Sequence, residues 1–162
     1  MAKLVDTLAA QRGALERLAA RVPGFGGYLE RDQRRQADKL LRDHGAARLE
    51  AIGRELQARI AKVPLDEIGE LSELVTQAEK LRGELRFADR GYSGFFDEAK
   101  LDGDAALDAV YEKDERIVQQ VEELAAQVGE GEVSAPALRG SLKRLGLALA
   151  DRRNAILGLG SR

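Results

Sequence analysis

The chain has 162 residues, of which 44% are hydrophobic and 33% are charged, and its formal net charge is −2. This length and composition suit one domain with its own core and exclude a disordered chain. The chain contains no cysteine, which excludes disulfides and thiolate sites and favours the reducing cytoplasm. It also lacks a long apolar run, so we expect neither a signal peptide nor a transmembrane segment.

Positive and negative side chains are unevenly distributed along the chain. Residues 1–62 and 133–162 carry an excess of Lys and Arg, whereas residues 63–132 carry an excess of Asp and Glu. Two interpretations stay open. Basic helices can lie beside acidic ones within the molecule, or the surface is bipolar and docks a charged partner.

Apolar residues recur at three- and four-residue steps in five stretches, which is the spacing of amphipathic helices. The first stretch predicts a helix over residues 3–22, which Pro23 ends. The second predicts a long helix over residues 29–62. His44 and Arg48 interrupt the apolar stripe of this second helix.

Three more helices are predicted in the second half of the chain. The third covers residues 65–88, and the fourth covers residues 104–128 with Asp114 at a position where its stripe requires an apolar residue. Ser134 is the predicted N-cap of the fifth helix. We expect this helix to end before a frayed tail at residues 158–162.

Together these elements predict an all-α protein, a single-domain antiparallel bundle of about five helices over residues 1–162. The short connection at Pro64 makes the second and third helices one long helical hairpin. Because the second helix is the longer of the two, residue 88 is expected beside about residue 40 of its partner.

The sequence carries no recognisable catalytic or cofactor motif. His44 is the only histidine, so neither a histidine metal site nor a di-iron bundle motif can be assembled. The glycines after Pro23 follow no predicted strand and therefore do not form a dinucleotide-binding loop. We expect no enzymatic activity, no cofactor and no metal.

The charged residues that interrupt apolar stripes are candidates for a buried polar cluster. Buried charges usually pair, so we expect Arg48 or His44 to contact an acidic side chain, with Asp114 as the favoured partner. The alternative is that Arg48 extends to solvent and that Asp114 lies at an edge of the bundle.

Six of the seven aromatic residues lie in two glycine-rich segments, residues 23–28 and 87–96, which interrupt the predicted helices. Chain geometry allows the second break to run back along the second helix toward the first. We therefore predict one aromatic cluster, with arginines at its rim, that either supports the fold or forms a recognition surface. The aromatic members are Phe25, Tyr28, Tyr92, Phe95 and Phe96, and the rim arginines are Arg34, Arg35 and Arg90.

Two basic groups are candidate anion contacts. One lies at residues 31–39, where aspartates dilute the positive charge. The other is less diluted and comprises Arg139, Lys143, Arg144, Arg152 and Arg153. For the first group the alternative is a solvated face with pairs inside the helix, and for the second it is pairing with the acidic fourth helix.

Three motifs give the chain a distinctive pattern, namely Pro23-Gly24-Phe25-Gly26-Gly27-Tyr28, then Arg34-Arg35-Gln36-Ala37-Asp38-Lys39-Leu40-Leu41-Arg42, then Arg86-Phe87-Ala88-Asp89-Arg90-Gly91-Tyr92-Ser93-Gly94-Phe95-Phe96. With these motifs the sequence resembles a family of short uncharacterised bacterial helical proteins. The similarity covers about two-thirds of the chain. The resemblance implies a bacterial cytoplasmic protein and carries no known activity.

The sequence therefore favours a non-enzymatic interaction or scaffold protein that binds another protein or itself. The alternative is an anion-binding module that contacts nucleic acid or an anionic membrane surface through basic helix faces. Steep salt dependence of binding would distinguish the alternative from the favoured function.

Overall fold

The structure is a computed structural model, and it describes residue 13 and the ranges 16–24, 34–88, 104–129 and 134–160. A short helical segment at residues 16–21 precedes four long helices. The long helices are α2 (Arg34–Ile60), α3 (Leu65–Phe87), α5 (Asp104–Gly129) and α6 (Ala135–Gly160). These helices confirm the predicted all-α bundle with a long helical hairpin.

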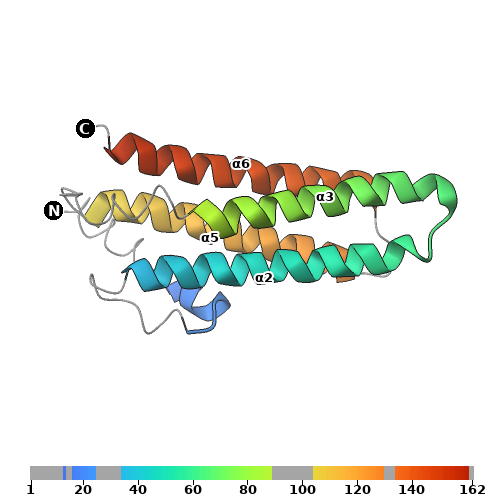
Figure 1. The fold of residues 1–162 in the computed structure, drawn as a ribbon. Helices are drawn as coiled ribbons and strands as arrows, with labels where there is room; N and C mark the ends of the chain where they lie inside the picture. Colours follow the sequence, from blue (N-terminus) through green and yellow to red (C-terminus); the bar gives the residue numbers. More distant parts are fainter. Residues whose placement is uncertain (1–12, 14–15, 25–33, 89–103, 130–133, 161–162) are drawn as a thin grey trace.

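The four long helices form two antiparallel hairpins, α2–α3 and α5–α6, that lie against each other (Figure 1). Helix α2 packs beside α5, and α3 packs beside α6. The helices of each of these two pairs run in the same direction. Arg59 near the end of α2 donates a hydrogen bond to the carbonyl of Val128 near the end of α5, and Arg139 at the start of α6 reaches Glu70 at the start of α3.

Charge alternates around the bundle in this arrangement. The basic helices are α2, with seven Lys or Arg against four Asp or Glu, and α6, with five against one. The acidic helices are α3, with six Asp or Glu against three Lys or Arg, and α5, with seven against two. Each neighbouring pair joins a basic helix to an acidic one. The interpretation that basic helices lie beside acidic ones therefore describes the bundle.

Ion pairs also join neighbouring helices, with the cation on either the basic or the acidic helix. Arg139 of α6 lies 3.0 Å from Glu70 of α3, and Arg82 of α3 lies 3.7 Å from Glu50 of α2. The side chains of these pairs are between one-third and one-half exposed, so each contributes at most about 1 kcal/mol to stability. Their main effect is to favour this pairing of helices over one that places like charges together.

All four long helices contribute to one hydrophobic core. Close approach helps to form it, because a Cβ atom built at Gly45 of α2 would lie 2.6 Å from Cδ2 of Leu85 of α3. A larger residue at this position would therefore force the Leu85 side chain to move or the two helices of the hairpin to separate. The largest fully buried core side chains are Leu49, Ile52, Leu56, Leu74, Leu85, Ile117, Leu124, Leu138 and Leu145.

Helix boundaries match the predicted local signals in most places. Asp66 and Glu67 occupy the first turn of α3, where carboxylates interact well with the helix dipole. The Ser134 hydroxyl accepts a hydrogen bond of 3.4 Å from the amide of Ala137 and so caps α6. One boundary was wrong, because α6 continues to Gly160 through most of the predicted frayed tail. Each glycine there costs the helix only about 1 kcal/mol.

The helical segment at residues 16–21 lies outside the four-helix core. Leu18 and Val22 are fully buried against Leu41 of α2 and Val118 of α5, in a cluster separate from the main core. The segment ends at a turn that contains Gly24, whose φ of 82° favours glycine. This position agrees with the predicted end of the first helix.

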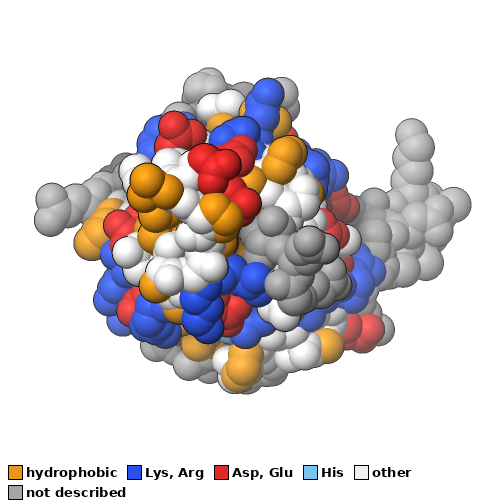
Figure 2. Space-filling model, turned by 90° about the vertical axis from the view of Figure 1, so that its right-hand side faces the viewer, with side chains coloured by type: hydrophobic (Ala, Val, Ile, Leu, Met, Phe, Trp, Pro, Cys, Tyr) orange, Lys and Arg blue, Asp and Glu red, His pale blue; other side chains and the backbone are white. Residues whose placement is uncertain are grey.

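The end of the bundle at which α2 joins α3 has a mixed surface (Figure 2). Hydrophobic, acidic and basic side chains are interspersed on this face. Leu65, the first residue of α3, is 86% exposed. None of the described helices is both long and apolar enough to cross a membrane.

Candidate functional site

A buried ion pair joins the two helices of the second hairpin. Asp114 of α5 accepts a hydrogen bond from Nε of Arg152 of α6, and both side chains are only 4% exposed. Asp114 is therefore buried, but the predicted partner was wrong. Arg152 occupies a core position of α6 and supplies the opposite charge.

Arg48 does not belong to a buried cluster, because its side chain is exposed. The neighbouring residue Leu49 points into the core instead, with 1% of its surface exposed. Consecutive helical residues lie about 100° apart around the axis, so the apolar stripe passes through Leu49 and leaves Arg48 outside it.

His44 is half-buried on α2. Desolvation lowers the pKa of its imidazole below the ordinary value of 6.5, and the positive charge of Arg48 lowers it further. Glu122 of α5 has the opposite, smaller effect on this pKa. The sole histidine therefore favours the neutral form in the folded protein.

This pKa shift predicts a pH dependence of stability. Because the unfolded chain holds the His44 proton more readily than the folded one, the free energy of unfolding falls as pH drops below 6.5 toward the folded-state pKa. Replacing His44 by Gln removes this contribution. We expect urea titrations between pH 7 and pH 5 to show a shallower loss of stability for His44→Gln than for the wild type, and equal slopes would contradict the assignment.

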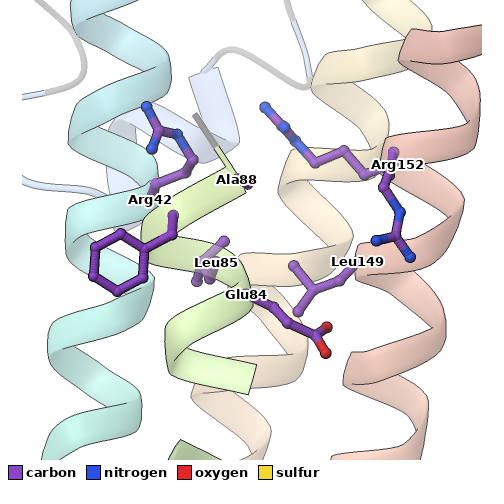
Figure 3. Close-up of a pocket in the computed structure, with 8 residues that line it drawn as sticks. Arg42, Glu84, Leu85, Ala88, Leu149 and Arg152 are labelled. Carbon is purple, nitrogen blue, oxygen red and sulfur yellow. The ribbon is translucent and has the colours of Figure 1, made fainter. Parts of the chain in front are cut away.

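A pocket opens where α3 ends between α2 and α6 (Figure 3). Helix α3 stops at Phe87, whereas α2 and α6 extend further along the bundle (Figure 1). The space left has a volume of about 250 Å³. We call it the arginine-lined pocket. Its walls are formed by Arg42 of α2, by Glu84, Leu85, Phe87 and Ala88 at the end of α3, and by Leu149, Arg152 and Arg153 of α6.

Two of the three arginines in the pocket wall are held by the protein. Arg42, which is 3% exposed, donates a hydrogen bond of 3.2 Å from Nη1 to the carbonyl of Arg86 in the last turn of α3. This bond satisfies a helix-end carbonyl and places a cation at the negative end of the helix dipole. Arg152 is held by Asp114. Arg42 and Arg152 are therefore fixed in position. The lining also contains Glu84, and Asp114 neutralises Arg152, so the excess of positive charge in the pocket is small.

The rim of the pocket combines an exposed aromatic ring with an exposed cation. Phe87 is 74% exposed, which is unusual for so large an apolar side chain, and Arg153 is exposed beside the pocket. Aromatic residues and arginine are enriched where proteins contact one another. The pocket can therefore accept an apolar group that carries a negative charge.

The position of the pocket bears on the hairpin geometry predicted from sequence. The contact between Arg42 and Arg86 confirms that the end of α3 lies beside the early part of α2, close to the expected register. The aromatic cluster itself remains a prediction. Phe25, Tyr28, Arg90, Tyr92, Phe95 and Phe96 lie outside the described residues, and only the backbones of Arg34 and Arg35 are described.

The residues of the C-terminal basic group make different contacts. Arg152 pairs with the acidic fourth predicted helix, as one interpretation required, whereas Arg139 pairs with Glu70 and Glu73 of α3. Arg153 lines the pocket. The sequence contained a signal for Arg152, since it lies in register with Leu145, Leu149 and Ile156 on an apolar stripe.

Within the described ranges, no group of three or more His, Cys, Asp or Glu side chains is placed to hold a metal ion. No known protein family matches the chain, and no match is found among curated proteins or solved structures.

Proposed function

We propose that this protein is a non-catalytic helical interaction module that binds another protein through the arginine-lined pocket. The observation that carries the proposal is Phe87, which remains 74% exposed at the rim of a pocket whose wall contains Arg42 and Arg152. The matching partner segment presents an apolar side chain next to a carboxylate. The lack of cysteine and the family resemblance favour a bacterial cytoplasm as the setting.

The distribution of charge favours a protein partner over nucleic acid or an anionic membrane. Strong phosphate binding needs several cations that are not neutralised by neighbouring anions. Arg139 pairs with two glutamates, and Arg54 and Arg82 both pair with Glu50. Cations on α2, α3 and α6 are therefore partly neutralised by carboxylates that lie beside them.

Replacing Phe87 by Ala should weaken the partner's binding by about 30-fold, because central aromatic contacts often contribute about 2 kcal/mol. Arg153→Glu should also weaken it, since a negative charge at the rim repels the partner's carboxylate. The measurement is quantitative capture of the partner from a host extract by the tagged full-length chain, followed by titration with the purified partner.

Matched controls are available elsewhere on the surface. Leu65→Ala removes an apolar side chain that is also highly exposed but lies at the other end of α3, and Arg116→Glu reverses an exposed charge on α5. Both controls should bind like the wild type. If Phe87→Ala and Arg153→Glu also bind like the wild type, the pocket is not the contact.

A further inference from the structure

Residues 16–22 pack against the outside of α2 and α5 (Figure 1), and we call the surface that they cover the groove. Leu18 and Val22 are buried against Leu41 of α2 and Val118 of α5, and Leu40 and Tyr111 are partly buried against the same cluster. This cluster is separate from the main core. The groove is therefore an apolar surface distinct from the main core, and the chain's own helical segment covers it.

Charge complementarity accompanies these apolar contacts. Arg17 makes a two-pronged hydrogen-bonded ion pair with Glu115, in which Nη2 lies 2.8 Å from Oε2. Arg21 Nη1 lies 3.4 Å from the carboxylate of Glu122. The hydrogen bonds from Arg17 lower the pKa of the Glu115 carboxyl below its ordinary value. The groove thus presents carboxylates on α5, and its occupant presents arginines.

The occupant carries its recognition elements in six consecutive residues. Arg17-Leu18 is followed by two alanines and then by Arg21-Val22, so an arginine precedes each buried apolar residue. This is helix-in-groove recognition, in which residues four apart anchor one face of a helix. Any chain that presents this sequence as a helix can make the same contacts.

The segment that covers the groove and the groove itself can belong to different chains. A turn at Pro23 and Gly24 ends the segment, and residues 25–33 separate it from α2. A stretch of nine residues can extend up to about 30 Å. In domain swapping, a connection of this kind carries a terminal segment into the same site on a second copy.

We propose that the groove between α2 and α5 is a self-association site, in which residues 16–22 of a second copy replace the chain's own segment. Two chains that exchange this segment form a closed symmetric dimer and keep every contact described above. A second copy is the favoured occupant because its sequence is the one that the groove is seen to hold. The inference is independent of the arginine-lined pocket, which uses other residues.

In the wild type, the segment of a second copy has to compete with the chain's own segment, which is tethered close to the groove. A short tether supplies an effective concentration in the millimolar range, so dilute wild-type protein keeps its own segment bound. Charge reversal removes this advantage. One variant combines Arg17→Glu with Arg21→Glu, and the other combines Glu115→Arg with Glu122→Arg, so that in each variant segment and groove repel each other.

Mixing the two variants restores opposite charges only between chains. The segment of each variant matches the groove of the other, so both segments can exchange at once. We expect sedimentation velocity to show monomers for each variant alone and a species of twice the monomer mass for the equimolar mixture. The dimer should dissociate at high salt, because exposed ion pairs are screened there.

A mixture that stays monomeric, while both variants keep the wild-type helical circular dichroism signal, would mean that the groove serves only its own chain and would overturn the proposal. If a double variant loses helical signal, the same test is made with one reversed pair, Arg17→Glu mixed with Glu115→Arg. This pair alters only positions that are exposed or half-buried. Failure of this test leaves partner binding at the pocket unaffected, so the two proposals fail separately.

Discussion

Replacing Asp114 by Ala should lower the free energy of unfolding by about 3–5 kcal/mol, because it leaves the Arg152 guanidinium in the core without its carboxylate. Both side chains are only 4% exposed, so water cannot replace the lost partner without rearrangement. A loss of this size is a large part of the stability of a typical domain. Urea denaturation followed by circular dichroism measures it.

The double variant Asp114→Leu with Arg152→Met is the control for this prediction. It removes both charges together and fills the space with apolar atoms, so it should recover most of the lost stability. Recovery would show that the uncompensated charge causes the defect of Asp114→Ala. A double variant as unstable as the single one would contradict this explanation.

Two equally buried leucines should differ in their effect on stability because they belong to different clusters. Leu124 is 1% exposed in the main core, and Leu124→Ala should cost about 2–5 kcal/mol. Leu18 is 0% exposed, but it anchors only the segment at residues 16–22. We expect Leu18→Ala to cost less than Leu124→Ala, at most the free energy with which that segment docks, because the segment can detach while the main core stays packed.

Hydrogen exchange distinguishes these two cases. Leu124→Ala should speed exchange of the slowest amides in all four long helices, since their exchange requires global unfolding. Leu18→Ala should speed exchange only in the segment and in the parts of α2 and α5 that it covers. Faster exchange throughout the core of Leu18→Ala would show that the segment is part of the cooperative fold.

The sequence predicted the helices well because their signals are local. Helical periodicity, the acidic first turn of α3 and the cap at Ser134 depend only on nearby residues. The hairpin offset also followed from helix lengths. The choice of neighbours between the two hairpins followed only from one of two interpretations that the sequence left open, the one in which basic helices lie beside acidic ones.

The site was predicted less well because it depends on contacts between helices. Asp114 was identified correctly as an interruption of an apolar stripe, but its partner lies 38 residues away on another helix. Arg152 interrupts an apolar stripe in the same way, and the two lie at matching heights of the α5–α6 hairpin. Matching two stripe interruptions of opposite charge on neighbouring predicted helices would have identified this ion pair. The arginine-lined pocket could not be predicted, because it results from where α3 ends relative to α2 and α6.

Site-specific photo-crosslinking from position 87 tests the central claim most directly. A photoreactive phenylalanine analogue replaces Phe87 in the full-length chain within its native host, and a second chain carries the analogue at Leu65 as a control. The account predicts a protein crosslinked from position 87 only, through a segment in which an apolar residue adjoins Asp or Glu. Crosslinking of the same proteins from both positions, or of no protein from position 87, would contradict it.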